Sequence, residues 1–190
     1  MTVKEFDRPR DGRSRRVGVV PDERLILRPV VPEDEDAFRR AHRALAADGF
    51  AFGLWYDEDT PFARYVERLA EQERGENLPD NRVPGSFRVA DVGGVIVGRA
   101  SIRHRLNDWL MQEGGHIGYG VLPEHRRRGY ATEILRQSLG IVAGHGVERV
   151  LVTCDDDNVG SAAVIERCGG VLAEVGVGHD GQALRRYWIG

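Results

Sequence analysis

Alternation of hydrophobic and polar positions predicts most of the regular structure in this chain. The stretch RLILRPV, from Arg24 to Val30, places Leu25 and Leu27 opposite Ile26, which is typical of a strand. The next stretch, PEDEDAFRRAHRAL, begins with acidic residues and brings its apolar positions onto one face, as in an amphipathic helix. A second helix is expected to begin at Thr60-Pro61.

Strands then dominate the middle of the chain. SFRVADV and VIVGRASIRHRL flank Gly93-Gly94, a pattern that predicts a hairpin. The apolar stretch VERVLVTC predicts a strand buried on both faces. The remaining expected elements are a glycine-rich strand over 114–123, a helix over 129–144, a helix over 159–168, and a final hairpin of VLAEVGV and LRRYWI across GHDG.

This order predicts a mixed α/β domain, with a centrally antiparallel sheet flanked by helices. The strand–helix–strand unit after residue 114 favours parallel pairing with a right-handed crossover. Residues 1–21 are basic and lack apolar periodicity, so we expect an N-terminal arm that is flexible or lies along the domain. Residues 22–190 are expected to form a single domain.

Composition narrows the function classes. The 190 residues carry a net charge of -3, whereas a dedicated nucleic-acid domain is usually strongly basic. No apolar run approaches the roughly 20 residues of a membrane helix, and the N-terminus has no signal-peptide core. Cys154 and Cys168 form neither a disulfide framework nor a metal-ligand pattern. We therefore expect a cytoplasmic protein without a metal site.

One loop combines three features of an anion site. In VLPEHRRRGYATEIL, a strand ends, three arginines follow, and a helix begins at Gly129. Helix N-termini expose unpaired N–H groups, glycine permits close backbone approach, and arginines add donors. The loop lacks both the P-loop and the dinucleotide-binding glycine patterns. A solvated loop whose glycine only starts a helix remains the alternative.

Two motifs change the balance between these alternatives. The spacing Arg126-x-x-Gly129-x-Ala131 resembles the acyl-CoA signature of the GNAT acetyltransferase superfamily, Q/R-x-x-G-x-G/A. The segment DNVGSAAVIERCGG resembles that superfamily's second signature. The resemblance covers residues 22–190 and is nearest to a subgroup of bacterial N-acetyltransferases.

The resemblance implies a splayed strand pair that holds acetyl-CoA as cosubstrate. The strand ending at Val121 would separate at a bulge from Val150–Cys154, with pantetheine in the gap and pyrophosphate on the arginine–glycine loop. The residues expected to bind acetyl-CoA are Gly120, Val121, Leu122, Arg126, Arg127, Arg128, Gly129, Tyr130, Ala131, Thr132, Asn158 and Ser161.

The catalytic residues are less clearly marked. The family often carries a tyrosine as general acid where this chain has Ile165, and often an aromatic residue where it has Gly170. His116, Tyr119 and Asp155 are the candidate proton carriers. The structural alternative is a hydrogen bond within the sheet for His116 and core packing for Tyr119. For Asp157 or Asn158, which follow Asp155, the alternative is capping of the helix that begins at Val159.

Three function hypotheses follow. The first is an acetyl-CoA-dependent N-acetyltransferase, in which a primary amine of a small molecule or protein N-terminus attacks the thioester directly. The second is a non-catalytic CoA-binding sensor, which Ile165 keeps open. The third is a nucleic-acid binder, against which the acidic net charge argues. We expect no nucleic-acid or membrane partner, and a homodimer is left open.

Overall fold

The computed structural model describes residues 24–190, so the expected arm at 1–21 lies outside the described residues. The larger of two sheets has four strands in the order β1-β2-β3-β4, and every neighbouring pair is antiparallel. These strands are β1 (Leu25–Arg28), β2 (Gly85–Val92), β3 (Val95–Arg103) and β4 (Ile117–Val121). The β2–β3 hairpin turns at Gly93 and Gly94, both in the left-handed region that favours glycine.

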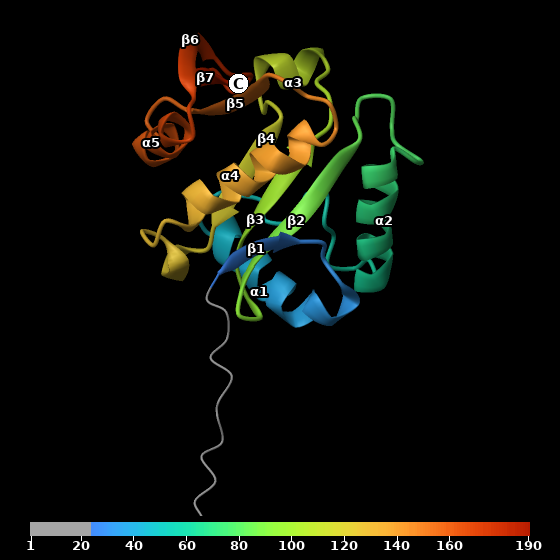
Figure 1. Cartoon of the computed structure of the whole chain (residues 1–190). Coiled ribbons are helices and arrows are strands. Elements are labelled where there is room, and N and C mark those ends of the chain that lie inside the picture. Colours follow the sequence, from blue (N-terminus) through green and yellow to red (C-terminus); the bar gives the residue numbers. More distant parts are fainter. Residues whose placement is uncertain (1–23) are drawn as a thin grey trace, which may run out of the picture.

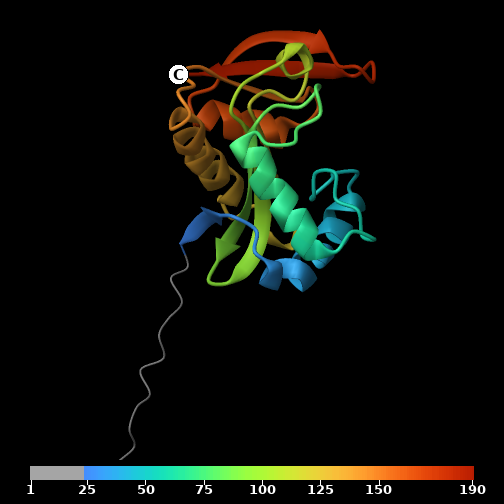
Figure 2. The ribbon, with the colours of Figure 1, turned by 90° about the vertical axis from the view of Figure 1, so that its right-hand side faces the viewer.

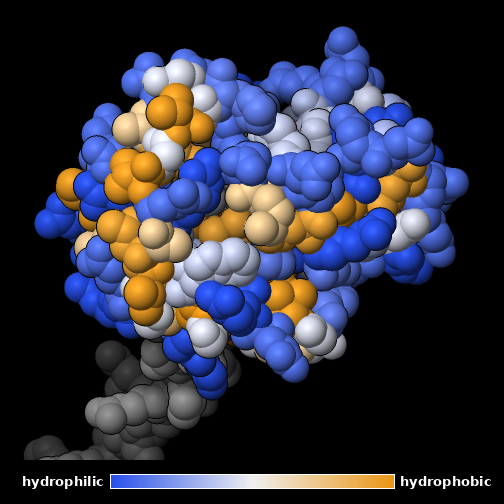
Figure 3. All heavy atoms as spheres, turned by 90° about the horizontal axis from the view of Figure 1, so that it is seen from above, coloured by the Kyte–Doolittle hydropathy of each residue, from blue (hydrophilic) through white to orange (hydrophobic). Residues whose placement is uncertain are grey.

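The smaller sheet is built from the C-terminal strands in the order β5-β7-β6, again antiparallel. Its strands are β5 (Val150–Asp155), β6 (Val171–Val177) and β7 (Ala183–Ile189). β6 is an edge strand on which Val171, Val175 and Val177 are exposed. Hydrophobic side chains reach the surface among hydrophilic ones on this side of the molecule (Figure 3).

Helices cover both faces of the larger sheet (Figures 1 and 2). α1 (Glu35–Ala46) and α2 (Phe62–Arg74) lie on one face, over a cluster centred on Phe38 and Phe87. α4 (Tyr130–Ala143) crosses the opposite face, where Ile134 and Leu135 are fully buried. The other two helices are α3 (Asp108–Gln112) and α5 (Val159–Arg167). None of the described helices combines the length and apolar character needed to cross a bilayer.

The predicted fold class is confirmed, and the expected elements occur in the expected order. The five-residue helix α3 was not predicted, because so short a segment shows no periodicity. The expected parallel pairing was wrong: β4 and β5 belong to different sheets, and every ladder among the described strands is antiparallel. The physical reason lies at the junction between the two sheets.

Candidate functional site

The two sheets are joined at His116, just before β4. Its backbone N–H donates to Leu151 O at 2.7 Å, and its ring Nδ1 accepts from Leu151 N at 2.9 Å. An added Cβ at Gly115 would lie 2.5 Å from Leu151 O, so only glycine permits this approach. Beyond this contact β4 continues into the large sheet and β5 into the small one (Figure 1).

The expected splayed strand pair is therefore present, but its cause differs from the expected bulge. β3 and β4 pair from Gly98↔Val121 to Ile102↔Ile117 without a register shift. Register shifts lie instead between Ala90 and Asp91 in β2 and between Leu172 and Glu174 in β6. The strands diverge because the His116 side chain occupies the position where a ladder partner of Leu151 would bond.

The free edge of β4 faces the diverging strands. Leu122 N–H donates to Val97 O at 2.9 Å, and alternation along an antiparallel ladder turns the backbone groups of Gly120 toward β3 as well. Val121 O points the other way and accepts from Arg126 Nε at 3.2 Å. Of the three residues expected to pair with pantetheine, only Val121 offers its backbone to the free edge.

The arginine–glycine loop leads from this edge into α4. Gly129 is the N-cap, with φ of 83°, and an added Cβ there would meet no protein atom within 4 Å. Arg127 also has a left-handed φ of 63°, which is uncommon for a residue with a side chain. The first N–H groups of α4, at Tyr130, Ala131 and Thr132, have no partner within the helix. Backbone donors without a partner in the helix and open space at Gly129 thus coincide, as an anion site requires.

Two of the three arginines are partly engaged. Arg126 Nη2 lies 2.6 Å from Asp48 Oδ2, which ties the loop to the end of α1. Arg128 Nη2 donates to Glu124 O at 3.2 Å. Residues 126–129 are all exposed, so these side chains can exchange such partners for a ligand.

Asn158, Ser161 and Tyr119 come together across the diverging strands. Asn158 Oδ1 accepts from Ser161 N at 3.0 Å and so caps α5, which was the structural alternative for this residue. Ser161 Oγ lies 2.9 Å from Tyr119 Oη, linking α5 to β4. Burial raises the pKa of Tyr119, so its phenol keeps its proton at neutral pH.

The other two candidate proton carriers lie elsewhere. His116 is 5% exposed, and burial together with the nearby Arg103 lowers its pKa. Asp155 ends β5 beside a surface pocket of about 420 Å³, lined by Asp155, Asp156, Asp157, Asp180, Gln182 and Ala183. Burial and the charges of Asp157, Asp180 and Glu113 raise the pKa of Asp155. Within residues 24–190, no hydrogen bond joins Asp155 to His116 or Tyr119.

Ile165 and Cys154 are both buried in the hydrophobic core, which indicates a structural role for each. Ile165 is fully buried in the core cluster under α4. Cys154 is a free thiol, 7% exposed, and burial raises its pKa to about 11. Among the described residues, no group of three or more histidine, cysteine or carboxylate side chains could hold a metal ion.

Sequence reasoning assigned no role to two arginines on β3, the buried Arg99 and the half-buried Arg103. Their spacing in the sequence could have identified them, because two charged residues four positions apart in an apolar strand lie on the same face. Arg99 is 4% exposed and reaches Gly118 O in β4. Arg99 faces the side of the sheet that α1 and α2 cover, where its guanidinium lies over the rings of Phe50 and Phe87.

Comparison with known proteins places this geometry in a family. The model of the acetyltransferase (GNAT) domain matches residues 24–171. No curated protein sequence matches the chain significantly. RimJ of Mycobacterium smegmatis, solved in complex with CoA-disulfide, is 19% identical, with a TM-score of 0.65 over 89% of this chain and 83% of its own.

Two further structures show the same fold. The acetyltransferase of Agrobacterium tumefaciens strain C58 is 22% identical, with a TM-score of 0.58 over 98% of both chains. The microcin C7 self-immunity acetyltransferase MccE, solved with acetyl-CoA and AMP, is 16% identical, with a TM-score of 0.64 over 86% of this chain and 91% of its own. Since the family match covers well over half of the sequence, the chain belongs to the GNAT acetyltransferase family and is an acyltransferase.

Proposed function

We propose that this protein transfers the acetyl group of acetyl-CoA to a primary amine of a small molecule or a protein N-terminus. Acetyl-CoA is the cosubstrate, as in this family's acetyltransferases. The observation that carries the proposal is the open, left-handed Gly129 at the N-terminus of α4, next to the free edge of β4. Pyrophosphate on the α4 N-terminus leaves the pantetheine arm to run along Val121 toward Ser161.

The chemistry needs a neutral amine, a polarised thioester carbonyl and a proton for the departing thiolate. Tyr119 is the donor we propose for the thiolate, because its protonated phenol lies 2.9 Å from Ser161 Oγ, where the proposed pantetheine arm ends. Asp155 is the better proposed acceptor of the amine proton, because its raised pKa makes it a stronger base. His116 fits less well, since its Nδ1 already accepts a hydrogen bond from Leu151.

Direct attack is favoured over a covalent acyl-enzyme. The only candidate nucleophile suggested by the sequence near β5 is Cys154, and a thiol with a pKa of about 11 is almost entirely protonated at neutral pH. The sensor alternative loses its main support if Tyr119 supplies the proton that Ile165 cannot. A homodimer stays a prediction, supported by the exposed valines of the edge strand β6.

The test compares two valine substitutions with equal backbone strain. Gly129 and Gly146, at opposite ends of α4, have φ of 83° and 80°, and neither has an atom within 4 Å of an added Cβ. A branched side chain at either position carries a left-handed penalty of about 1–2 kcal/mol. Only Gly129→Val should block pyrophosphate, so only this variant should lose CoA binding.

Thermal unfolding with and without CoA provides the measurement. In the wild-type protein and in Gly146→Val, CoA at 100 times its Kd should add about 2.7 kcal/mol of stability. Gly129→Val should remain folded by circular dichroism but show no stabilisation. Equal CoA responses in the two variants would exclude this loop as the pyrophosphate site.

A further inference from the structure

Arg99 and Arg103 place two guanidinium groups beside the centre of β4. Arg99 Nη1 donates to Gly118 O at 3.1 Å and Nη2 to Ala51 O at 2.8 Å, while its carbon lies 4.4 Å from the centre of the Phe50 ring. Its Nε is buried without a hydrogen-bond partner. Arg99 is thus a cation held in place under the loop that follows α1, with one N–H group that has no hydrogen-bond acceptor among the described residues.

Arg103 has an unused face. Its Nη1 donates to Gly114 O at 2.9 Å and contacts Gly115 O at 3.4 Å. Within residues 24–190, no acceptor bonds Nε or Nη2, and neither atom is among the fully buried orphans. Nε and Nη2 form the planar edge that binds carboxylates side-on, as Arg28 binds Asp91 at 3.0 and 2.8 Å elsewhere in this protein.

No carboxylate within residues 24–190 neutralises these two cations. Among the described residues, neither arginine forms an ion pair, and burial lowers the pKa of Arg99 to about 9 and that of Arg103 to about 10. Both groups remain positive at neutral pH, and each disfavours the other. Buried charges are normally paired, because an uncompensated one is costly. A bound anion would supply the partner that residues 24–190 do not provide.

Gly118 leaves space for that anion. An added Cβ at this position would lie 3.4 Å from Arg103 Nη1 and 3.7 Å from Arg99 Nη1. Because residue 118 is glycine, no side chain occupies the position on which both guanidinium groups converge. Gly118 and Tyr119 are neighbours on β4, so their side-chain positions lie on opposite faces of the strand, and the Tyr119 hydroxyl contacts Ser161 of α5.

The acidic pocket lies at the other end of the same short segment. Gly114 O accepts from Arg103, whereas the preceding Glu113 raises the pKa of Asp155. Gly114 N also bonds Thr153 Oγ1 at 3.2 Å, two residues before Asp155. Positive and negative sites therefore flank residues 113–115.

We propose that Arg103, supported by Arg99, binds a carboxylate of the acceptor, which makes the acceptor a zwitterion such as an amino acid or a short acidic peptide. This inference rests on the proposed acetyl transfer and specifies its acceptor. The amine faces the acidic end of the segment and the carboxylate faces the arginine end, so the two charges orient the nucleophile. Arg103 is a binding residue, and Arg99 is a positioning residue that holds β4 beside it through Gly118 O.

The experiment uses product-like probes, so that binding can be measured without turnover. N-acetylglycine and N-acetylglycinamide differ only in the carboxylate, and isothermal titration measures each with and without CoA. The wild-type protein should bind N-acetylglycine at least tenfold more tightly than the amide. Arg103→Gln should remove this preference, Arg103→Lys should retain part of it, and the exposed neighbour Arg105→Gln should leave it unchanged.

Each contrary outcome is distinct. Equal wild-type affinities for the two probes, or no binding of either with and without CoA, would overturn the carboxylate site. Tighter binding of inorganic phosphate than of N-acetylglycine would replace the carboxylate with a phosphate. If the wild-type protein does not bind CoA, this result counts against the proposed acetyl transfer. It leaves the carboxylate site to be judged from the probe titration without CoA. Circular dichroism of each variant checks the fold.

Discussion

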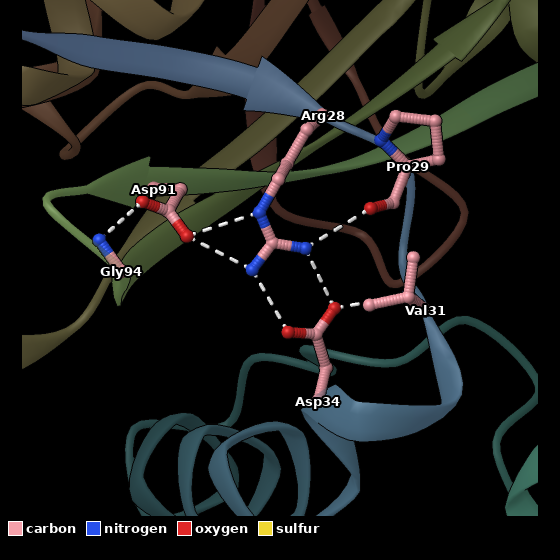
Figure 4. A network of polar contacts seen from close by, with 6 residues as sticks. All are labelled: Arg28, Pro29, Val31, Asp34, Asp91 and Gly94. Carbon is pink, nitrogen blue, oxygen red and sulfur yellow. Dashed lines mark hydrogen bonds and ion pairs between the residues drawn. The ribbon is translucent and has the colours of Figure 1, made fainter.

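Two arginine sites in this fold balance burial and charge in opposite ways. Arg28 has a side chain that is 27% exposed, yet it holds both Asp34 and Asp91 (Figure 4). Arg99 is 4% exposed, and its partners among residues 24–190 are two carbonyl oxygens. Since desolvation cost rises with burial, a purely structural role would predict the reverse distribution of carboxylates. The contrast indicates that the Arg28 network stabilises the fold, whereas Arg99 and Arg103 await an anion.

The Arg28 network is complete in itself. Arg28 Nη1 and Nη2 bond the two oxygens of Asp34 at 2.7 and 2.8 Å. Asp34 also accepts from Val31 N at 2.9 Å, and Asp91 Oδ1 accepts from Gly94 N at 2.7 Å. Figure 4 shows how these bonds join β1, the turn before α1 and the β2–β3 hairpin. The hydrogen bonds and charges of Asp34 and Asp91 raise the pKa of Arg28, and the bonds from Arg28 lower the pKa of Asp34.

The largest effect is expected from Arg28→Met. This change leaves Asp34 and Asp91, 8% and 6% exposed, as neighbouring buried carboxylates without a cation. Breaking a buried pair on one side typically costs about 3 kcal/mol or more of unfolding free energy. Urea denaturation at pH 7 measures the loss. Arg136→Met, which removes an exposed pair with Glu133, should cost less than about 1 kcal/mol. Equal losses in both variants would show that the Arg28 network contributes no special stability.

A smaller effect is expected from Arg99→Met. The change removes two hydrogen bonds to carbonyl oxygens but strands no carboxylate, and it relieves the desolvation of a cation. The net loss of unfolding free energy should be about 1 kcal/mol, well below that of Arg28→Met. The same urea titration compares the two directly. A loss as large as that of Arg28→Met would mean that Arg99 is a structural residue and would weaken the contrast between the sites.

Local patterns explain why the elements were predictable. Leu25, Leu27 and the apolar faces of α1 and α4 carry the periodicity of strand and helix within a few residues. The left-handed Gly129 and the N-cap Asn158 are also local, so the motifs around them could be recognised from spacing.

Long-range contacts explain what could not be predicted. His116 bonds Leu151 across 35 residues, and this contact rather than a local bulge separates the sheets. Arg99 bonds Ala51 across 48 residues, and Arg28 meets Asp91 across 63. Spacing in the sequence shows that Arg99 and Arg103 share a face, but only the fold shows which of the three arginines has carboxylate partners. The acceptor side of the site depends on such contacts throughout.

His104 illustrates a third response to burial, which is loss of the proton. Its ring stacks on His145 with centroids 3.5 Å apart, and its Nε2 lies 2.9 Å from Ser86 Oγ, which also bonds Glu73. Burial and the neighbouring His145 lower the pKa of His104 to about 4, and Arg88 adds to this shift while Glu73 opposes it. His104 is therefore neutral in the folded protein at neutral pH.

The smallest effect is expected from His104→Gln, and it depends on pH. The unfolded chain binds this proton near pH 6.5, whereas the folded protein binds it only near pH 4, so acid favours unfolding across that interval. Stability from a neutral His104 is fully present above pH 6.5 and is lost as the pH falls toward 4. Glutamine can still bond Ser86 but cannot take up the proton, so the variant should lose less stability than the wild type, by up to about 1 kcal/mol after solvent screening. Melting temperatures from pH 7 to pH 4 measure this difference, with the exposed His179→Gln as the control. If the melting temperatures of the wild type and His104→Gln fell in parallel, protonation of His104 would not contribute to the loss of stability in acid. Burial of His104 would then carry no electrostatic cost comparable to that of Arg99.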